Sequence, residues 1–467
     1  KSLDLREVDR HLFAGFQRKG GLPRFLGGFL DLVFDRSSGR LLDLPSIDAI
    51  RAIRQLTLMY GKIALPCSDA RERAAMAGFI ECERDVKLCD HGRSQSDYDD
   101  FRRVSRVLFE RAFTVMDRKI HDLEVVPKHG PGSTADRLLG NQKWNQKEWP
   151  VRLDRVFPAG EFLLPNWKYY DQLDDIDILE PGQERPVRVV SVPKTLKTPR
   201  IIAIEPTAMQ YAQQGILRVM LDAIEAVPTL DSMLGFDDQT PNQRMAQVGS
   251  LSGSLATLDL SEASDRVSNQ LVREMSAPWP YLHEALDATR SRKADVPGYS
   301  VQRLAKFASM GSALCFPVEA MVFLTCIFLG IEQTLNRPLT RGDVERHRHL
   351  VRVYGDDIII PVDYVPSVVS MLEHFGAKVN TAKSFWSGSF RESCGKEYYL
   401  GEDVSIVRVR QLFPTQRQDA TGVISTVSLR NQLYQAGYWQ TVKWLDETIR
   451  KVIHYFPTVD PSSPVLG

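Results

Sequence analysis

The sequence that decides the fold reads Val351-Arg352-Val353-Tyr354-Gly355-Asp356-Asp357-Ile358-Ile359-Ile360. Two short runs rich in β-branched residues flank a Gly-Asp pair, a pattern typical of a β-hairpin with a two-residue turn and a glycine at positive φ. Such a hairpin carries two adjacent carboxylates at its tip. Because neighbouring carboxylates repel, a cation that neutralises them would stabilise the turn, and Mg²⁺ prefers such oxygen ligands. The alternative interpretation of the four central residues is an ordinary surface turn.

The bulk composition limits the class of protein. With 467 residues the chain is too long for a single small core, so two or three lobes are expected. A hydrophobic content of 43% and a charged content of 25% are typical of a globular protein. Basic and acidic residues are equal at 59 each, so binding of a polyanion must depend on local basic clusters.

Other sequence features suggest an intracellular protein. The six cysteines form no C-x-x-C pair and are expected to be reduced thiols. The apolar stretch 320–330 is too short to span a bilayer and is expected to be a buried helix, so no membrane partner is predicted. The chain begins at Lys1 rather than Met, so the sequence leaves open whether it includes the true beginning of the protein.

Hydrophobic periodicity predicts an α+β core between helical regions. The first hundred residues are expected to be mostly helical. Predicted helices cover residues 47–60, 101–116, 207–227, 264–275, 312–333, 365–375 and 421–456. Predicted strands cover residues 187–192, 200–204 and 255–260, and residues 378–385 lead to a further strand.

A third carboxylate, Asp259, closes the predicted strand that contains Ala256-Thr257-Leu258. A carboxylate at the end of a strand can point into a cleft without the cost of burial. Together with Asp356 and Asp357 it would allow two divalent ions to be held side by side, which is the two-metal arrangement for in-line nucleotidyl transfer. The alternative for Asp259 alone is a cap of the following helix.

Two further segments are candidates for nucleotide contacts. The loop from Val192 to Arg200 contains Lys194, Lys197 and Arg200, no acidic residue, and two prolines that stiffen it. It suits an incoming triphosphate, although three basic residues also fit a solvated loop. Ser309-Met310-Gly311-Ser312 permits close backbone approach to a ribose or a template, or else caps the apolar helix that follows.

In this order, the segments around Lys194–Arg200, Asp259–Asp265, Ser309–Gly311, Tyr354–Asp357 and Lys383 resemble motifs F, A, B, C and D of right-hand viral RNA-dependent RNA polymerases. The strings Asp238-Gln-Thr-Pro-Asn-Gln-Arg244 and Phe390-Arg-Glu-Ser-Cys-Gly-Lys396 are similar to strings in replicase β-subunits of Q-beta-type single-stranded RNA phages. The resemblance is strong from about 187 to 410 and thin on either side.

The resemblance implies a role for each matched residue. Asp259 and Asp356 would be the principal ligands of two Mg²⁺ ions, which Mn²⁺ could replace, with Asp357 assisting. The other roles concern the nucleotide: Lys194, Lys197 and Arg200 would hold the triphosphate, Ser309 and Gly311 would contact the nascent pair and ribose, Asp265 would help to recognise the 2′-hydroxyl, and Lys383 would be the general acid for pyrophosphate.

Three assignments stay open at this point. Many related polymerases place the sugar-reading Asp five residues after the first Asp, where this chain has Ser264, so that role is shared between Ser264 and Asp265. Lys378 is an alternative to Lys383 as the general acid. Arg391 and Glu392 lie in a position that resembles motif E, and we expect them to be structural or to contact the growing strand.

The implied architecture is an α+β right hand with a ferredoxin-like antiparallel palm sheet and helical fingers and thumb. The expected segments are 1–200 (N-terminal region and fingers), 201–263 (palm), 264–305 (fingers insertion), 306–395 (palm) and 396–467 (thumb).

The implied function is primer-independent replication of a single-stranded RNA phage genome from NTPs in the cytoplasm of an infected bacterial host. Single-stranded RNA is template and product, and implied protein partners are host elongation factors Tu and Ts and a ribosomal RNA-binding protein. Alternatives are a reverse transcriptase or DNA polymerase, a catalytically silent RNA-binding scaffold, and a narnavirus-like or botourmia-like replicase. The small or polar residues Ala263, Ser264 and Asp265 favour ribonucleotides over deoxyribonucleotides.

Overall fold

The computed structural model describes residues 1–467 except positions 10, 165, 196, 197, 461 and 464. The chain divides into two compact units, each described by itself. The first comprises Lys1–Ala75, Ser191–Arg200 and Glu402–Gly467, and the second comprises Met76–Val190 and Ile201–Gly401. This division differs from the five predicted segments, whose boundaries stay a prediction.

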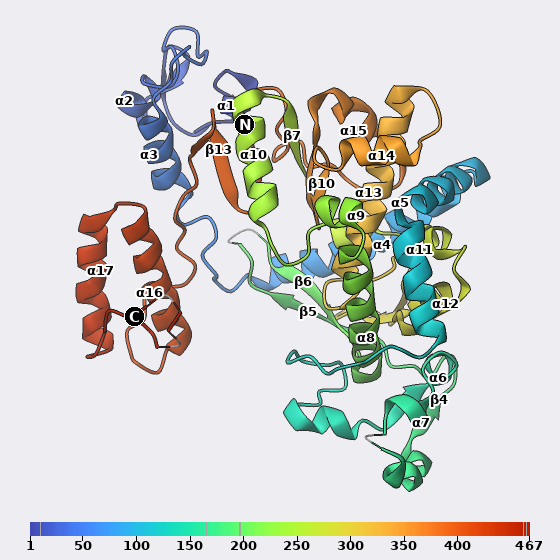
Figure 1. The fold of residues 1–467 in the computed structure, drawn as a ribbon. Coiled ribbons are helices and arrows are strands. Elements are labelled where there is room, and N and C mark those ends of the chain that lie inside the picture. Colours follow the sequence, from blue (N-terminus) through green and yellow to red (C-terminus); the bar gives the residue numbers. More distant parts are fainter. Residues whose placement is uncertain (10, 165, 196–197, 461, 464) are drawn as a thin grey trace. The chain divides into compact units, whose positions relative to one another are not determined.

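The second unit contains most of the regular structure (Figure 1). Its helices are α4 (Asp69–Gly92, which starts in the first unit), α5 (Gln95–His121), α6 (Val151–Asp154), α7 (Ala159–Phe162), α8 (Thr207–Glu225), α9 (Pro228–Met233), α10 (Thr240–Ser252), α11 (Asn269–Ser276), α12 (Pro280–Thr289), α13 (Cys315–Leu335), α14 (Arg341–His347) and α15 (Val365–His374). Its 3₁₀ turns are η1 (Gly140–Asn145), η2 (Trp167–Asp175), η3 (Ala263–Arg266) and η4 (Val362–Tyr364). Its strands are β3 (Glu148–Pro150), β4 (Asp177–Leu179), β5 (Val187–Val192, which ends in the first unit), β6 (Arg200–Ile204, which starts in the first unit), β7 (Leu255–Asp259), β8 (Lys293–Asp295), β9 (Gln302–Arg303), β10 (Arg352–Tyr354), β11 (Asp357–Pro361), β12 (Phe390–Ser393) and β13 (Lys396–Tyr399).

A three-stranded antiparallel sheet in the order β10-β11-β7 lies at the centre of this unit. The predicted hairpin is confirmed: β10 and β11 are joined by a two-residue turn, and Gly355 has a φ of 58°. Both faces of the sheet are covered because side chains alternate along a strand. Ile358 and Ile360 enter the main core, whereas Ile359 packs with Ala246 of α10 on the opposite face.

Helix α13 is the main buried helix of this unit and packs against α5 and α15. It is long and apolar enough to cross a membrane by length and composition, but 89% of its most apolar window is buried inside the protein. The prediction of a buried helix is therefore confirmed, although the helix begins at Cys315 rather than Ser312. A helix that is apolar on nearly all sides is buried by its neighbours, and α13 also contacts β10 of the central sheet.

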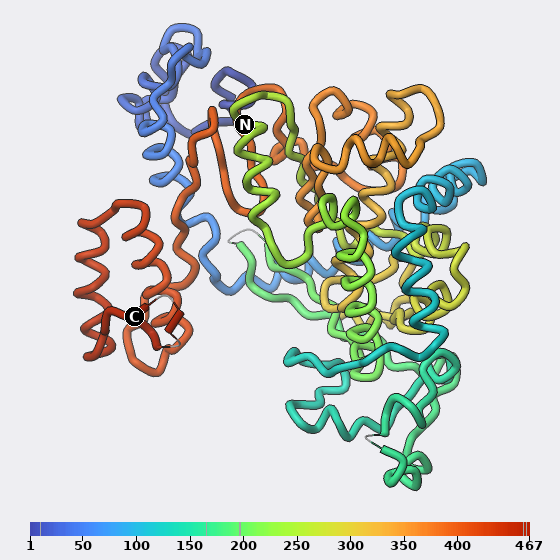
Figure 2. The backbone as a smooth tube through the Cα atoms, in the orientation of Figure 1, coloured from blue at the N-terminus to red at the C-terminus, as the bar shows by residue number. Residues whose placement is uncertain are grey.

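The first unit consists of shorter elements. They are α1 (Ser2–Leu5), α2 (Gly27–Leu30), α3 (Ile47–Leu58), α16 (Ala420–Gln435), α17 (Trp439–Val452), β1 (Arg18–Lys19), β2 (Leu22–Pro23) and β14 (Glu402–Asp403). Helices α16 and α17 pack side by side, as the backbone trace shows (Figure 2). The side-chain amide of Gln55 both donates to and accepts from the backbone of Val407, which ties α3 to the extended segment before α16.

Several predicted elements need correction. Residues 421–456 form two helices instead of one, because Gly437 turns the chain between them with a φ of 83°. Residues 264–275 are a 3₁₀ turn followed by α11, whose first turn is capped by the Ser268 hydroxyl. The first 46 residues contain only short elements, so the prediction of a mostly helical first hundred residues holds from Ile47 onward.

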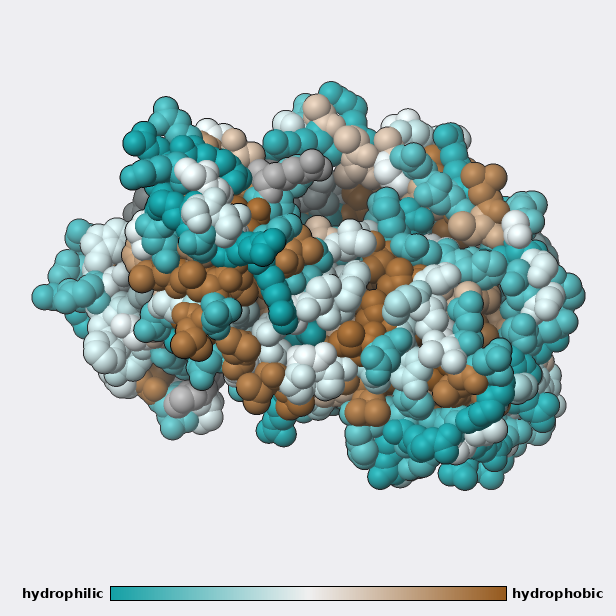
Figure 3. Space-filling model, turned by 90° about the horizontal axis from the view of Figure 1, so that it is seen from above, coloured by the Kyte–Doolittle hydropathy of each residue, from teal (hydrophilic) through white to brown (hydrophobic). Residues whose placement is uncertain are grey.

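The surface seen in Figure 3 is mostly hydrophilic, with apolar residues in separate patches.

Candidate active site

The strand register brings the three predicted carboxylates to one end of the central sheet. Asp259, the last residue of β7, is the direct Cα partner of Asp357, the first residue of β11. Asp356 occupies the turn next to Asp357 and is exposed. The sequence-based expectation that these residues lie close together is confirmed for their backbone positions.

Asp259 is held from the segment that follows α15. Asn380 donates its side-chain amide to Asp259 Oδ2 at 3.0 Å, and Lys383 Nζ lies 3.5 Å from the same oxygen. Burial raises the pKa of Asp259 above its usual range, and the charge of Asp356 adds to this, while Lys383 and Asn380 oppose it. A further positive charge nearby would stabilise the ionised form of this carboxylate.

Asp357 is more enclosed than its neighbour Asp356. The backbone N–H of Cys394, in the turn between β12 and β13, donates to Asp357 Oδ2 at 3.2 Å. Burial raises the pKa of Asp357 to about 7, with repulsion from Asp356 the next cause and smaller contributions from Asp259 and Glu392. The hairpin resembling motif E therefore anchors one carboxylate of the site.

A fourth carboxylate, Glu319 of α13, lies beneath the hairpin and was not predicted as a site residue. Its exposed fraction is 4%, and its Oε2 atom has no hydrogen-bond partner among the described residues. Burial raises its pKa to about 8, and Asp356 and Asp265 contribute to the rise. A Cβ atom on Gly355 would lie 2.3 Å from Phe316 Cε2 and 3.2 Å from Glu319 Oε1, so only glycine fits the turn against α13.

The arrangement of these carboxylates bears on whether the site can hold divalent cations. Within the described part of the chain, no three His, Cys, Asp or Glu side chains are gathered closely enough to form a ready-made metal site. However, Asp259, Asp356 and Asp357 repel one another, and each supplies the oxygen ligands that Mg²⁺ prefers. The donor set fits a cation that would relieve this repulsion.

Asp265 is held by a buried ion pair. Lys306 Nζ lies 2.8 Å from Asp265 Oδ1 and 3.2 Å from Glu83 Oε1. Ser264 instead lies near Glu319, and its hydroxyl opposes the rise in the pKa of Glu319. Ser264 and Asp265, the two candidates for contact with the ribose 2′-hydroxyl, therefore have different surroundings.

The segment Ser309-Met310-Gly311-Ser312 packs closely on β6. Ala203 N donates to Met310 O at 2.7 Å, and a Cβ on Gly311, whose φ is 126°, would lie 1.9 Å from Ala203 O. Ser309 is buried, and its hydroxyl has no hydrogen-bond partner among the described residues. The sequence predicted a close backbone approach at Gly311. That approach is present, but the neighbouring backbone is strand β6 and not a ligand.

The structure does not test the basic loop as a triphosphate site. Lys194 and Arg200 are exposed and belong to the segment assigned to the first unit, whereas the carboxylates belong to the second. Lys197 lies outside the described residues. Arg391, expected to be structural or to contact the growing strand, is fully buried and donates to backbone carbonyls of Leu255 and Gly388.

Opposed carboxylates at the end of an antiparallel sheet, backed by a buried helix, are suited to metal-assisted phosphoryl chemistry. A family model described as RNA replicase, beta-chain, matches residues 183–449, which is more than half of the chain. The chain therefore belongs to the RNA replicase beta-chain family.

Curated relatives support this membership. The RNA-directed RNA polymerase subunit beta of Escherichia virus Qbeta is 39% identical over 223 residues, covering 48% of this chain and 35% of that protein. The corresponding chain of Escherichia phage MS2 is 37% identical, covering 46% and 36%. That of Enterobacteria phage SP is 36% identical over 357 residues, covering 73% and 57%. The chain thus spans about a third to just over half of the length of these relatives.

Two solved structures are similar to this chain over part of their length. One is described as "RdRp complex" (TM-score 0.42, 12% identity, 71% of this chain and 31% of that one). The other is described as "RNA dependent RNA polymerase,vp4,dsRNA" (TM-score 0.42, 11% identity, 73% and 31%).

Proposed function

We propose that this chain is an RNA-dependent RNA polymerase that replicates a single-stranded RNA phage genome. The reaction is template-directed addition of a nucleotide to an RNA 3′-hydroxyl with release of pyrophosphate. The observation that carries the proposal is the register pairing of Asp259 with Asp357, next to Asp356 at the turn. Membership of the replicase family supports the same reaction.

The carboxylates have unequal roles in this proposal. Asp259 and Asp356 would hold two Mg²⁺ ions, or Mn²⁺ in their place, and Asp357 would assist while it is bound by the Cys394 amide. Such ions activate the attacking hydroxyl and stabilise charge on the leaving phosphate. Asn380 fixes the orientation of the Asp259 carboxylate, so that its position is set before substrate arrives.

The remaining residues would bind and orient the nucleotide. Lys194, Lys197 and Arg200 would contact the triphosphate, Ser309 and Gly311 would contact the nascent pair, and Asp265 would read the ribose. Lys383 would protonate the departing pyrophosphate, a role that its exposed position beside Asp259 allows. Right-hand architecture with a ferredoxin-like palm and primer-independent initiation belong to the same proposal.

The proposal also includes the setting of the enzyme. The template and product are single-stranded RNA, and the reaction takes place in the cytoplasm of the infected bacterium. Host elongation factors Tu and Ts and a ribosomal RNA-binding protein are proposed partners, by analogy with Q-beta-type replicases. An assay with and without the purified factors separates an obligatory partner from an accessory one.

The test is Mg²⁺-dependent incorporation of labelled NTPs on a phage RNA template. The unaltered chain should synthesise RNA, and Asp356→Asn should reduce synthesis at least about a hundredfold, as expected when a charge-stabilising group is removed. Asp363→Asn is the matched control, since Asp363 is exposed and follows the same strand pair in η4. Equal synthesis by the unaltered chain and Asp356→Asn would contradict the proposal.

A further inference from the structure

Lys306 is a fully buried lysine that the proposed mechanism does not use. Its side chain has an exposed fraction of 0%, and its ammonium group lies 3.5 Å from the centre of the Phe79 ring. Burial lowers the pKa of Lys306, but Asp265 and Glu83 outweigh this and raise it above its usual value. The ammonium group is therefore charged, and its contacts restrict the conformations that the side chain can adopt.

The two carboxylates that contact Lys306 differ in exposure. Glu83 of α4 is 5% exposed, and its other oxygen accepts a hydrogen bond from Ala305 N at 2.7 Å. Asp265 is 24% exposed, and only its Oδ1 is bound by Lys306. One carboxylate thus anchors the lysine in the interior, while the other keeps an edge open to solvent.

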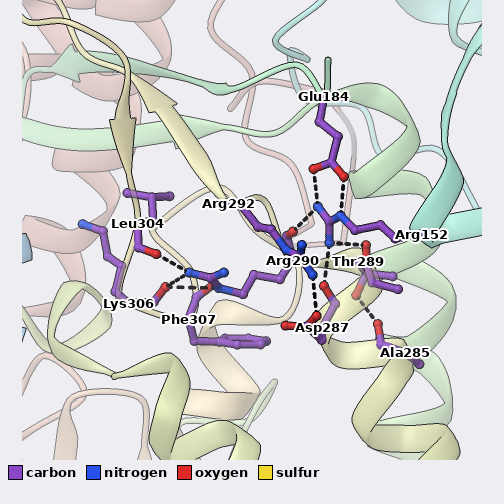
Figure 4. A network of polar contacts seen from close by, with 11 residues as sticks. Arg152, Glu184, Ala285, Asp287, Thr289, Arg290, Arg292, Leu304, Lys306 and Phe307 are labelled. Atoms are coloured by element: carbon purple, nitrogen blue, oxygen red, sulfur yellow. Dashed lines mark hydrogen bonds and ion pairs between the residues drawn. The ribbon is translucent and has the colours of Figure 1, made fainter. Parts of the chain in front are cut away.

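The backbone around Lys306 is fixed independently. Arg290 of the segment after α12 points its guanidinium at the loop that carries Lys306, as Figure 4 shows. It donates to the carbonyl oxygens of Leu304 at 2.6 Å and Lys306 at 2.8 Å. These hydrogen bonds hold the main chain at Lys306. Both the backbone and the ammonium group of this lysine therefore have defined positions.

The turn that carries Asp265 is also tied to α4. Cys82 Sγ donates to the Asp265 carbonyl at 3.4 Å, and Arg266 pairs with Asp85 at 3.1 Å. Three residues within one stretch of α4, Cys82, Glu83 and Asp85, therefore determine where η3 lies. The arrangement fixes both the backbone and the carboxylate of Asp265.

We infer that Lys306, anchored by Glu83, is a positioning residue that orients Asp265 so that its free oxygen can accept a hydrogen bond from the ribose 2′-hydroxyl of the incoming nucleotide. This inference rests on the proposed polymerase function and deepens it. It assigns the sugar-reading role to Asp265 rather than Ser264, because Lys306 holds one oxygen of the Asp265 carboxylate and leaves the carboxylate partly exposed. Lys306 itself does not touch the substrate.

The test compares single-nucleotide incorporation of ATP, 2′-deoxyATP and 3′-deoxyATP on a primed RNA whose next template base is uridine. In Lys306→Met the preference for ATP over 2′-deoxyATP, as a ratio of kcat/KM, should fall about tenfold, the loss expected when one charge-assisted hydrogen bond is misplaced. The preference for ATP over 3′-deoxyATP should not change, because only the 2′-hydroxyl is read.

Two further variants guard against a merely structural effect. Lys143→Met is the matched control, since Lys143 is also a buried lysine (3% exposed), and its ammonium group donates to the carbonyl oxygens of Gly130 and Gly132. It should lower stability and leave both ratios unchanged. Glu83→Gln retains size and the Ala305 contact but weakens the anchor, so it should lower the 2′ ratio by a smaller factor, and it provides the readout if Lys306→Met does not fold.

The outcomes distinguish a failure of the proposed polymerase function from a failure of the role inferred for Lys306. If the unaltered chain incorporates no ATP, the proposed polymerase function is wrong and the inference is wrong with it. If the unaltered chain is active but Lys306→Met and Glu83→Gln lose rate without any change in the 2′ ratio, Lys306 is only a structural group. A loss of both the 2′ and the 3′ preferences would likewise overturn the inference.

Discussion

Asp259 and Asp357 stand directly opposite each other across the antiparallel pair β7–β11, although only Asp357 is bound by a backbone amide from a neighbouring hairpin. This difference makes the carboxylates of the site unequal. Asp357 is fixed and largely enclosed, whereas Asp356 is exposed at the turn and free to meet a cation. The register therefore explains why adjacent aspartates in one turn would serve different purposes.

The first prediction concerns metal affinity. Asp259→Asn and Asp356→Asn should each weaken Mn²⁺ binding more than Asp357→Asn, because Asp357 acts mainly by supporting the turn; removal of such a supporting group costs about 10–100-fold in affinity. Mn²⁺ binding is measured by titration with the electron paramagnetic resonance signal of the free ion. Asp363→Asn should bind as the unaltered chain does. A larger loss for Asp357→Asn than for the other two would contradict the assignment.

The second prediction separates two roles of Lys383. If it donates a proton to pyrophosphate, Lys383→Ala and Lys383→Arg should both slow single-turnover incorporation about a hundredfold, because arginine keeps the charge but is a poor acid. If only the charge beside Asp259 matters, Lys383→Arg should be nearly as active as the unaltered chain.

Lys378→Ala is the matched control for this pair, since Lys378 is exposed and contributes its backbone carbonyl, which accepts from Ser261 N at 2.8 Å. Its rate should be unchanged. A loss of rate in Lys378→Ala with full activity in Lys383→Ala would transfer the general-acid role to Lys378.

The sequence was sufficient to predict the hairpin and the strands β5, β6 and β7, because these elements depend on local rules. Gly355 has the positive φ that its turn demands, and the β-branched runs on either side form β10 and β11. That the strand ending at Asp259 lies beside the hairpin was a hypothesis based on the chemistry of the three carboxylates, because a strand's partner is not encoded in its own residues.

The supporting residues of the site could not be predicted in the same way. Asn380 and Cys394 act on Asp259 and Asp357 through an amide side chain and a backbone N–H, neither of which has a sequence signature. Lys306 looks like any surface lysine until the fold buries it. Glu319 did carry a signal, since a carboxylate in an otherwise apolar helix is costly to bury and suggests a functional group nearby.

The third prediction concerns the glycine that packs on β6. Gly311→Ala should destabilise the protein by about 3 kcal/mol or more, because the new Cβ would combine an unfavourable φ with a clash against Ala203 O. Chemical unfolding measures this loss. Gly298→Ala is the control, since Gly298 has a φ of 83° but open space around it, so that it should lose only about 1 kcal/mol from backbone strain. Equal losses would show that the clash at Gly311 is relieved by movement of the loop.

The last prediction concerns pH-dependent stability and a buried carboxyl outside the candidate site. Glu205, after β6, is 4% exposed and accepts a hydrogen bond from the Ser291 hydroxyl. Burial raises its pKa to about 7, although Ser291, Gln213, Arg152 and Arg290 all favour the charged form. Since the ordinary value is 4.5, the folded state binds more protons than the unfolded state between these two pH values.

Stability should therefore fall as the pH rises from about 4.5 to about 7 and then level off, with an upper limit of about 3 kcal/mol for this group at 1.36 kcal/mol per pKa unit. Glu205→Gln should remove this part of the pH dependence, measured as the free energy of unfolding in urea at pH 5, 6, 7 and 8. Ser291→Ala should move the fall to higher pH, because it removes a hydrogen bond that favours the carboxylate. An identical pH dependence in the unaltered chain and Glu205→Gln would show that Glu205 is charged in the folded protein.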